Sequence, residues 1–452
     1  MFITDNIETK SNRTTIIILF SILIVFMASL SRFARMTTAV VWYDEWLTLQ
    51  ASSLSVLDIT NLKYMVFDSH PPMVYLLWKA IRYVAGDNES VMRVVAVIAS
   101  LLAVWMVYKA ASLVTGRVQA VLAAALMLIN TEWMWQSAAV RTYPFLDLAS
   151  TCAFYYTLRL FVLDDNRRTV LSGFCLSVAI SSWLHHFGAL VLILPVTLYL
   201  SRPVRPAHKF YIIGALLIIA PLTVYIATKN MAATQYPHVQ MAESLSLGRL
   251  LWGVRVMNLR EYAIPLATVS AGIVLLGAVL MRTRGGIGVF AASMTVGVFA
   301  FGAGQMIHLT TGYFAHLWPW ASVLMAHATI WRSRYVWLVI LFLAATIVIP
   351  MTDFLGGKQW PSQIEYRIAG EKIKDIRKPN DTLVILGWSE TPVQWYARSA
   401  GISSYDFENR LQTGCGDQRF IFVDGPFARH VTPENATKIV EHNGVSVASW
   451  TC

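Results

Sequence analysis

The sequence predicts an all-α polytopic membrane protein with about 11 transmembrane helices, followed by a small C-terminal α/β domain. Of its 452 residues, 56% are hydrophobic and only 14% are charged, about half the charged share of an ordinary soluble protein. Residues 1–352 hold 25 Lys and Arg against 14 Asp and Glu, whereas residues 353–452 hold 11 against 12. A single soluble globule is therefore excluded. We expect a transmembrane module over 1–352 and a soluble domain over 353–452.

Long apolar runs locate the transmembrane helices. A hydrocarbon core about 30 Å thick needs roughly 20 apolar residues per helix. Such runs occupy residues 15–34, 91–112, 118–136, 143–163, 169–186, 187–201, 210–228, 262–281, 287–305, 315–331 and 335–351. No clean small-residue cleavage site follows the first run, so we expect an uncleaved anchor and not a signal peptide.

Positive charges orient these helices. With a cytoplasmic N-terminus, every cytoplasmic connection is positive, as the positive-inside rule requires. The residues concerned are Lys10, Arg13, Lys109, Arg117, Arg167, Arg168, Arg202, Arg205, Lys209, Arg282, Arg284, Arg332 and Arg334. The net charge of +10 forms no single stripe, which indicates membrane topology and no nucleic-acid surface. The odd number of helices then places residues 353–452 outside the cytoplasm.

Two further apolar segments are expected to lie at the membrane interface. Residues 71–85 are too short to span a bilayer and contain Lys79 and Arg82, and counting them as a span would invert every later loop. Residues 244–260 place apolar side chains at helical spacing beside three arginines, which suit lipid phosphates. Residues 35–90 then form the first extracytoplasmic loop.

The C-terminal domain is predicted as alternating helices and strands. Ile364, Ile368, Ile373 and Ile376 mark an amphipathic helix. Strands are expected at 382–386, 419–423 and 445–448, and helices at 392–399 and after Pro433. Outside the cytoplasm, Cys415 and Cys452 could form a disulfide that holds the C-terminus, and two unpaired thiols are the alternative.

Two adjacent carboxylates follow the first apolar run, within Trp42-Tyr43-Asp44-Glu45-Trp46. Near lipid, desolvation raises the pKa of a carboxylate toward the range of a general base. Neighbouring helical positions point about 100° apart, so only one of Asp44 and Glu45 can face a given atom. The alternative is that both acids stabilise the start of a helix through its dipole.

Taken in order, these features resemble a known family. The first span, the Asp44–Glu45 pair, the His70-Pro71-Pro72 triplet and residues 139–144 (AVRTYP) resemble the bacterial dolichyl-phosphate-mannose-protein mannosyltransferase-like family. Its members are integral-membrane glycosyltransferases of the C-type fold, among them lipopolysaccharide-core galacturonosyltransferases and lipid A aminoarabinose transferases. The likeness covers residues 15 to about 200 and extends to the remainder only in layout.

The resemblance implies both a reaction and a location for the active site. The donor is a sugar on a polyprenyl phosphate, and the acceptor is a hydroxyl of a lipid, glycan or protein. Asp44 is implied as the catalytic base, and Glu45 as its neighbour or as a metal or acceptor contact. The site would lie at the extracytoplasmic face of the bacterial inner membrane.

Such a donor leaves a phosphate anion, which needs cations or hydrogen-bond donors around it. Arg141, beside Tyr143 at the outer end of the third span, is the first choice, and contact with lipid headgroups is the alternative. His70 is assigned either to substrate contact or to helix entry. His185 and His186 are assigned to substrate or metal binding, or to interfacial structure.

One departure from the family concerns a late loop. Relatives often carry an Arg–Tyr pair there, whereas residues 310–316 contain no arginine. His316 or His308 could take its place, although histidine is only partly charged at neutral pH.

The preferred hypothesis is therefore an inverting glycosyltransferase in which Asp44 deprotonates the acceptor hydroxyl. A transporter or flippase of lipid-linked sugars is the alternative, although the chain shows no repeated halves. The His, Cys and acidic residues show no strong metal-ligand spacing. The cofactor is therefore left unassigned, with a divalent metal as one candidate. The sequence does not indicate the sugar, the acceptor or the oligomeric state.

Overall fold

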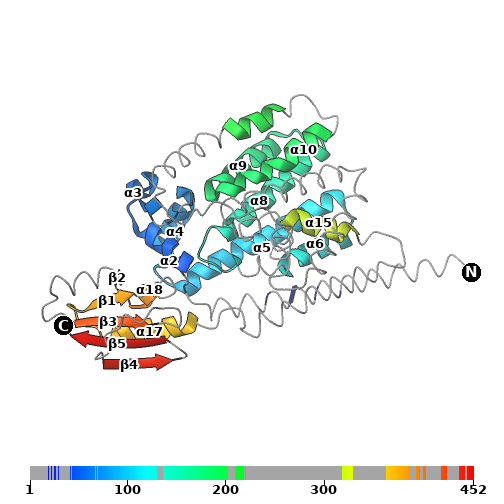
Figure 1. The fold of residues 1–452 in the computed structure, drawn as a ribbon. Coiled ribbons are helices and arrows are strands. Elements are labelled where there is room, and N and C mark those ends of the chain that lie inside the picture. The colour runs from blue at the N-terminus through cyan, green and yellow to red at the C-terminus, as the bar shows by residue number, and fades with distance from the viewer. Residues whose placement is uncertain are drawn as a thin grey trace, which may run out of the picture. The chain divides into compact units, whose positions relative to one another are not determined.

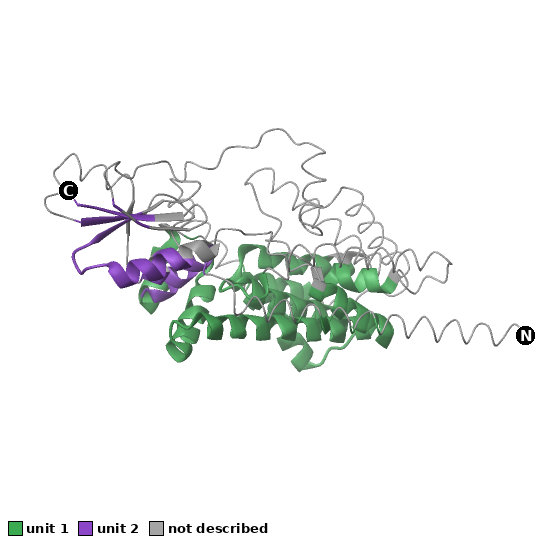
Figure 2. Ribbon diagram, turned by 90° about the horizontal axis from the view of Figure 1, so that it is seen from below, with its two compact units in different colours: residues 1–36, 55–355 green, residues 37–54, 356–452 purple. Residues whose placement is uncertain are grey.

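The computed structural model describes residues 41, 43–66, 68, 70–129, 136–201, 209–217, 219, 318–328, 363–385, 393–397, 401–403, 419–424, 437–442 and 445–451, with residues 19, 22, 25, 26 and 29. The chain divides into two compact units (Figure 2). Unit 1 comprises Met1–Met36 and Ser55–Leu355, and unit 2 comprises Thr37–Leu54 and Gly356–Cys452. The segment that carries Asp44 is thus grouped with the C-terminal residues.

Unit 1 is helical throughout its described part (Figure 1). Its elements are α3 (Val56–Thr60), η1 (Lys63–Val66), α4 (Pro72–Ala85), α5 (Glu89–Val114), α6 (Arg117–Ile129), α8 (Tyr143–Thr157), η2 (Leu158–Val162), α9 (Arg168–Leu184), η3 (His186–Leu192), α10 (Ile193–Ser201) and α15 (Trp318–Ala328). The η1 and η3 segments are 3₁₀ turns, and η2 is a π-helical continuation of α8.

Small side chains let these helices approach one another closely. Helix α5 packs against α6 and α8, α8 packs against α9, and α15 packs against α6. Ala103, Ala110 and Ala111 of α5 and Ala120 and Ala123 of α6 are fully buried in this core. Alanine at an interface brings helix backbones together, which favours dispersion contacts over long lengths of helix.

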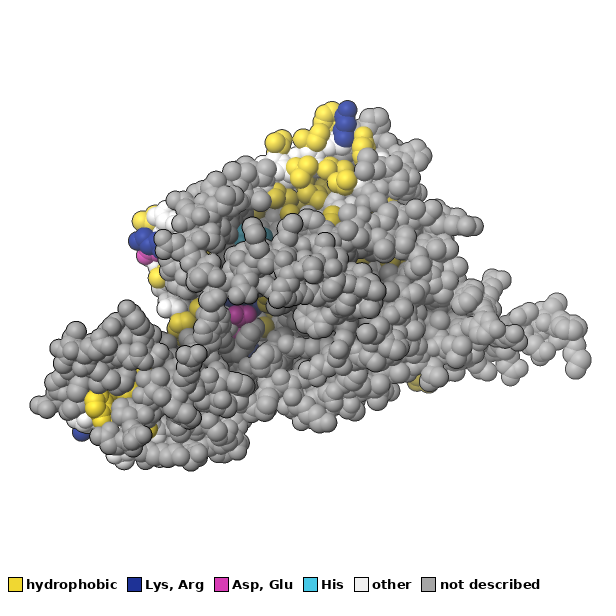
Figure 3. All heavy atoms as spheres, in the orientation of Figure 1, with side chains coloured by type: hydrophobic (Ala, Val, Ile, Leu, Met, Phe, Trp, Pro, Cys, Tyr) yellow, Lys and Arg dark blue, Asp and Glu magenta, His cyan; other side chains and the backbone are white. Residues whose placement is uncertain are grey.

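Helices are found where apolar runs were predicted between residues 91 and 201. Within the described part of the chain, α5 is the one helix whose length and hydropathy suffice to cross a bilayer. Its apolar residues Val94, Ile98, Leu101 and Trp105 are exposed along one side. Apolar side chains also gather over the region of α9 and α10 (Figure 3), where Leu176 is exposed. Surfaces of this kind suit lipid contact.

Residues 71–85 were expected to form a helix, and α4 occupies nearly all of them. Pro72 stands in its first turn, where a missing N–H costs nothing. Val74, Tyr75 and Trp78 are buried on one face, while Tyr83 and Val84 are exposed. The predicted helix is therefore present and has one buried face, and its place at the membrane interface stays a prediction.

Unit 2 contains a mixed five-stranded sheet in the order β2-β1-β3-β5-β4. The strands are β1 (Thr382–Ile385), β2 (Gly401–Ser403), β3 (Arg419–Asp424), β4 (Thr437–His442) and β5 (Val445–Thr451). β1 is parallel to β2 and β3, and β5 is antiparallel to β3 and β4. Unit 2 also includes α2 (Tyr43–Ser53), α17 (Gln363–Ile376) and α18 (Val393–Ala397).

Alternation of side chains explains the core of this unit. Leu383, Ile421 and Val447 point to one face of the sheet, where they pack with Ile373 of α17 and Val393 of α18. Phe420 and Trp450 are paired across β3 and β5 on the opposite face, with ring centroids 6.0 Å apart.

The prediction of a helix after Pro433 is wrong over residues 437–442, which form strand β4. Thr437, Ile439 and Val440 are β-branched and therefore suit a strand. Pairing with β5, which turns back directly after His442, decides the outcome. The short strand β2 was not predicted.

Several predictions fall outside the described residues. They are the spans at 262–281, 287–305 and 335–351, the interfacial helix at 244–260, the late-loop His308 and His316, and the Cys415–Cys452 pair.

Candidate functional site

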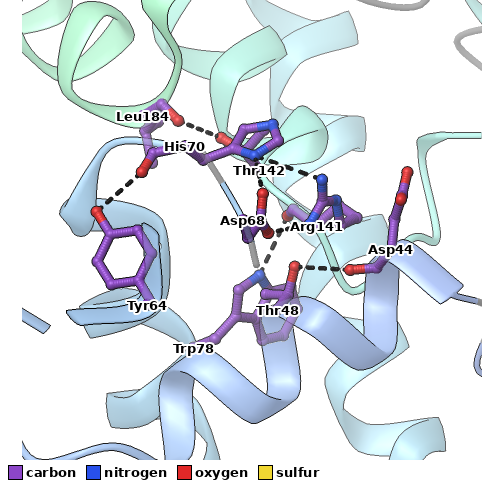
Figure 4. Close-up of polar contacts among 9 residues, drawn as sticks. All are labelled: Asp44, Thr48, Tyr64, Asp68, His70, Trp78, Arg141, Thr142 and Leu184. Atoms are coloured by element: carbon purple, nitrogen blue, oxygen red, sulfur yellow. Dashed lines mark hydrogen bonds and ion pairs between the residues drawn. The ribbon is translucent and has the colours of Figure 1, made fainter. Parts of the chain in front are cut away.

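The two acidic residues singled out from the sequence lie in the first turn of α2. Their side chains differ in exposure, because Glu45 is fully buried and Asp44 is half-buried. The backbone carbonyl of Asp44 accepts a hydrogen bond of 3.1 Å from the Thr48 hydroxyl (Figure 4). The 100° offset expected in a helix thus separates the pair, and Asp44 is the more accessible acid. Their position also suits the helix dipole, so the capping hypothesis holds as well.

A second polar cluster lies wholly within unit 1 and consists of Asp68, His70 and Arg141 (Figure 4). One carboxylate oxygen of Asp68, Oδ2, lies 2.7 Å from Nη1 of Arg141. The other, Oδ1, lies 2.7 Å from Nδ1 of His70. Nη2 of Arg141 lies 3.4 Å from the same Nδ1. We call these three residues the Asp68 cluster.

The Asp68 cluster is buried, so its charges interact strongly. Asp68 and His70 are each 7% exposed and Arg141 is 4% exposed. Burial by itself would raise the pKa of Asp68, but the Arg141 guanidinium and the His70 ring outweigh it and hold that pKa well below its usual range. Asp68 is therefore ionised at neutral pH and forms a buried ion pair with Arg141.

Hydrogen bonds from neighbouring elements hold both ends of the cluster. The Tyr64 hydroxyl donates to the His70 carbonyl oxygen at 2.9 Å. The Trp78 indole of α4 donates to the carbonyl oxygen of Arg141 at 3.1 Å, and Thr142 donates to the carbonyl oxygen of Leu184 at 2.8 Å. These bonds tie the turn before α8 to α4 and to the end of α9.

A buried arginine of α5 supports the same turn. Nη1 of Arg93 donates to the carbonyl oxygen of Ala138 at 2.9 Å, and Arg93 is only 1% exposed. A buried carbonyl oxygen without a hydrogen bond would destabilise the fold, and the charge-assisted bond from the Arg93 guanidinium supplies one. The turn that carries Arg141 is thus bonded to three helices.

Aromatic side chains named from the sequence surround the cluster. The His185 ring lies edge-on to the His70 ring with centroids 5.0 Å apart, and the Tyr143 ring lies 6.0 Å from His185. His185 is buried, and its Nδ1 accepts a hydrogen bond from the Phe187 amide. His186 is exposed and is 6.3 Å from His185 between ring centroids.

The structure therefore brings together His70, Arg141, Tyr143 and His185 from three distant segments. Asp44 and Glu45 belong to unit 2. Asp68 was missed at the sequence level, although it stands two residues before His70. The available signal was an acid two residues before the His70-Pro71-Pro72 triplet, but a single carboxylate that belongs to no repeating pattern does not stand out from other loop acids.

Among the residues described, no group of three or more His, Cys, Asp or Glu side chains is arranged to hold a metal ion.

Comparison with known proteins identifies the fold. Residues 69–227 match the family model for dolichyl-phosphate-mannose-protein mannosyltransferase. The structure is similar to ArnT from Cupriavidus metallidurans in the apo state, with a TM-score of 0.65 and 12% identity over 95% of this chain and 97% of that one. ArnT bound to undecaprenyl phosphate matches with a TM-score of 0.62 and 13% identity, over 95% and 98% of the two chains.

More distant likenesses extend to oligosaccharyltransferases. The enzyme from Archaeoglobus fulgidus in complex with Zn and sulfate matches with a TM-score of 0.54 and 12% identity, over 90% of this chain and 68% of that one. No curated protein matches the sequence. The resemblance to the mannosyltransferase-like family is confirmed, and the chain has the C-type glycosyltransferase fold. His70 and Arg141 both lie in the matched segment.

Proposed function

We propose, given this fold, that the protein transfers a sugar from a polyprenyl-phosphate donor to a hydroxyl of a lipid, glycan or protein at the extracytoplasmic face of a bacterial inner membrane. The observation that carries the proposal is the buried Asp68 cluster, whose His70 and Arg141 lie in the segment that matches the family. The likeness to ArnT with undecaprenyl phosphate bound supports a donor of the same chemical class.

The departing phosphate requires positive charge and hydrogen-bond donors. Arg141 supplies a guanidinium, and His70 supplies a second polar group whose Nε2 is buried. Such groups are most effective where water is excluded, because the effective dielectric constant is low there. We assign Arg141 and His70 to the donor phosphate. Tyr143 and His185 line the same region.

Asp44 is assigned as the general base. It takes the proton from the acceptor hydroxyl, whose oxygen attacks the anomeric carbon while the bond from that carbon to the phosphate oxygen breaks. Direct displacement inverts the anomeric centre. The half-buried state of Asp44 supports this choice over Glu45, which is enclosed by protein.

The test uses purified full-length protein in lipid nanodiscs with radiolabelled polyprenyl-phosphate sugars and a panel of hydroxyl acceptors. We expect label transfer, reduced about 10²- to 10⁴-fold by Asp44→Asn, the range for loss of a general base. Asp58→Asn is the matched control, since Asp58 stands in the first turn of α3 and pairs with the exposed Lys63. Its transfer rate should equal that of the unmodified protein.

Two outcomes would contradict the proposal. Equal rates for Asp44→Asn and Asp58→Asn would remove Asp44 as the base. Movement of intact donor across liposomes, without cleavage of the sugar-phosphate bond, would instead identify a flippase.

A further inference from the structure

We propose that Asp68 is a positioning residue, which orients Arg141 and fixes the His70 ring so that Nε2 is the atom offered to substrate. The identity of that substrate, the donor phosphate, rests on the proposed function. The orientation itself follows from the hydrogen bonds of the Asp68 cluster.

The donors and acceptors in the cluster can be assigned from chemistry. An ionised carboxylate only accepts hydrogen bonds, and a guanidinium only donates them. Asp68 accepts from Nη1 of Arg141 through Oδ2, so its Oδ1, 2.7 Å from His70, also accepts. Nδ1 of His70 must therefore carry a proton. A protonated Nδ1 has no lone pair with which to accept from Nη2 of Arg141. The distance between these two nitrogens, 3.4 Å, is accordingly long for a hydrogen bond.

This assignment determines the state of the other ring nitrogen. When His70 is neutral, Nε2 holds the lone pair, and when the ring is protonated, Nε2 donates. Nε2 is buried and has no hydrogen-bond partner among the described residues. An unpartnered buried nitrogen costs free energy, which a bound phosphate oxygen would offset by accepting from the protonated ring.

The neighbouring histidine, His185, is held in the other tautomer. Nδ1 of His185 accepts from the Phe187 amide, so its proton is carried on Nε2. The two rings, 5.0 Å apart, therefore present opposite tautomers, and the His70 tautomer is set by a carboxylate.

An amide in place of the carboxylate should reverse the His70 tautomer. In Asp68→Asn, the amide oxygen must face Arg141, which offers only donors. The amide NH₂ then faces Nδ1 of His70, and the ring proton moves to Nε2. The substitution keeps the shape of the side chain while it changes the state of the atom offered to substrate.

The experiment measures ring-nitrogen chemical shifts of ¹⁵N-histidine-labelled full-length protein in nanodiscs at about pH 8, where histidine is mostly neutral. A His70→Gln sample identifies the His70 signal among the ten histidines. We expect Nδ1 of His70 to carry a proton in the unmodified protein, and to lose it in Asp68→Asn, where the ring proton lies on Nε2. Asp87→Asn, which changes the exposed partner of Arg82, should leave the His70 signal unchanged.

An Nδ1 without a proton in the unmodified protein would overturn the proposal even where Asp68→Asn fails to fold. An unchanged tautomer in Asp68→Asn would overturn it as well.

Kinetics test the link to substrate. In the transfer assay, Asp68→Asn should raise the donor KM about 10- to 100-fold, because an amide NH₂ facing Nδ1 prevents the ring from carrying a second proton, so the charge-assisted hydrogen bond from Nε2 to the phosphate is lost. The acceptor KM should stay unchanged. A reversed tautomer with an unchanged donor KM would refute Nε2 as the substrate contact. The expected tautomers without transfer from any donor would refute the proposed function and leave the positioning role of Asp68 intact.

Discussion

Arg141 and Asp68 form an ion pair in which neither side chain is more than 7% exposed. Two charges taken out of water lose hydration energy, and their attraction recovers it only with good geometry and further hydrogen bonds. Asp68 has both, since each of its oxygens has a partner at 2.7 Å. The pair is therefore poor evidence of extra stability, but the loss of one partner leaves a buried charge without compensation.

Arg141→Met should therefore destabilise the protein by about 3 to 5 kcal/mol. The double variant Arg141→Met with Asp68→Asn should recover part of that loss, because it removes the uncompensated charge. Thermal unfolding in detergent, followed by tryptophan fluorescence, measures both. Lys63→Met is the control, because Lys63 is exposed and a surface pair contributes about 0 to 1 kcal/mol. An Arg141→Met protein as stable as this control would refute the estimate.

At the scale of elements, the junction between α9 and η3 places His185. The amide of His185 donates to the carbonyl oxygen of Ser181 at 3.2 Å, which ends α9. Gly188 packs directly on that turn, and a Cβ built at position 188 would lie 1.9 Å from the same oxygen. Only glycine allows this approach, so Gly188 keeps η3 against α9.

Gly188→Ala should force η3 away from α9 and displace the His185 ring. The clash is with backbone, so we expect a loss of about 1 to 3 kcal/mol, typical of overpacking, and a weaker affinity for the donor. Thermal unfolding and the donor KM measure the two effects. Gly214→Ala is the matched control, since nothing lies within 4 Å of its Cβ position. Equal behaviour of the two variants would contradict the role of Gly188.

At the scale of the whole molecule, the described surface of unit 1 suits a bilayer. The exposed apolar side of α5 ends at Trp105, which stacks on Tyr108 with ring centroids 5.6 Å apart. The Lys109 ammonium lies 5.9 Å from the Trp105 ring. Aromatic and basic side chains together are typical of the membrane interface. Lys109 is one of the residues that the charge rule places on the cytoplasmic side.

The orientation of the chain leads to a prediction about its C-terminal residues. With a cytoplasmic N-terminus and an odd number of spans, a reporter fused after Cys452 should lie outside the cytoplasm. Alkaline phosphatase fused there should be active, and green fluorescent protein should be dark. The same reporters placed between Lys109 and Arg117 should give the opposite result. A fluorescent C-terminal fusion would contradict this orientation.

Local pattern was sufficient for much of the fold. The length of the apolar run predicted α5 to within two residues at each end, because an isolated hydrophobic stretch in a bilayer has few alternatives to a helix. Strands β1, β3 and β5 were also predicted, since their apolar residues alternate or cluster between polar turns. Strand β4 was not, because its conformation depends on pairing with β5.

The site residues also fall into those that local sequence predicted and those that depend on tertiary contacts. The motifs identified His70 and Arg141 as candidates, and adjacent positions in a helix separated Asp44 from Glu45 through backbone geometry alone. The role of Asp68 depends on an arginine 73 positions later in the chain. Hydrophobic periodicity carries no information on such a pairing, since it reports which face of a helix is buried and not which polar groups meet there. Packing of α4, α5 and α9 around one turn brought the carboxylate and the guanidinium together, and burial made their contact strong.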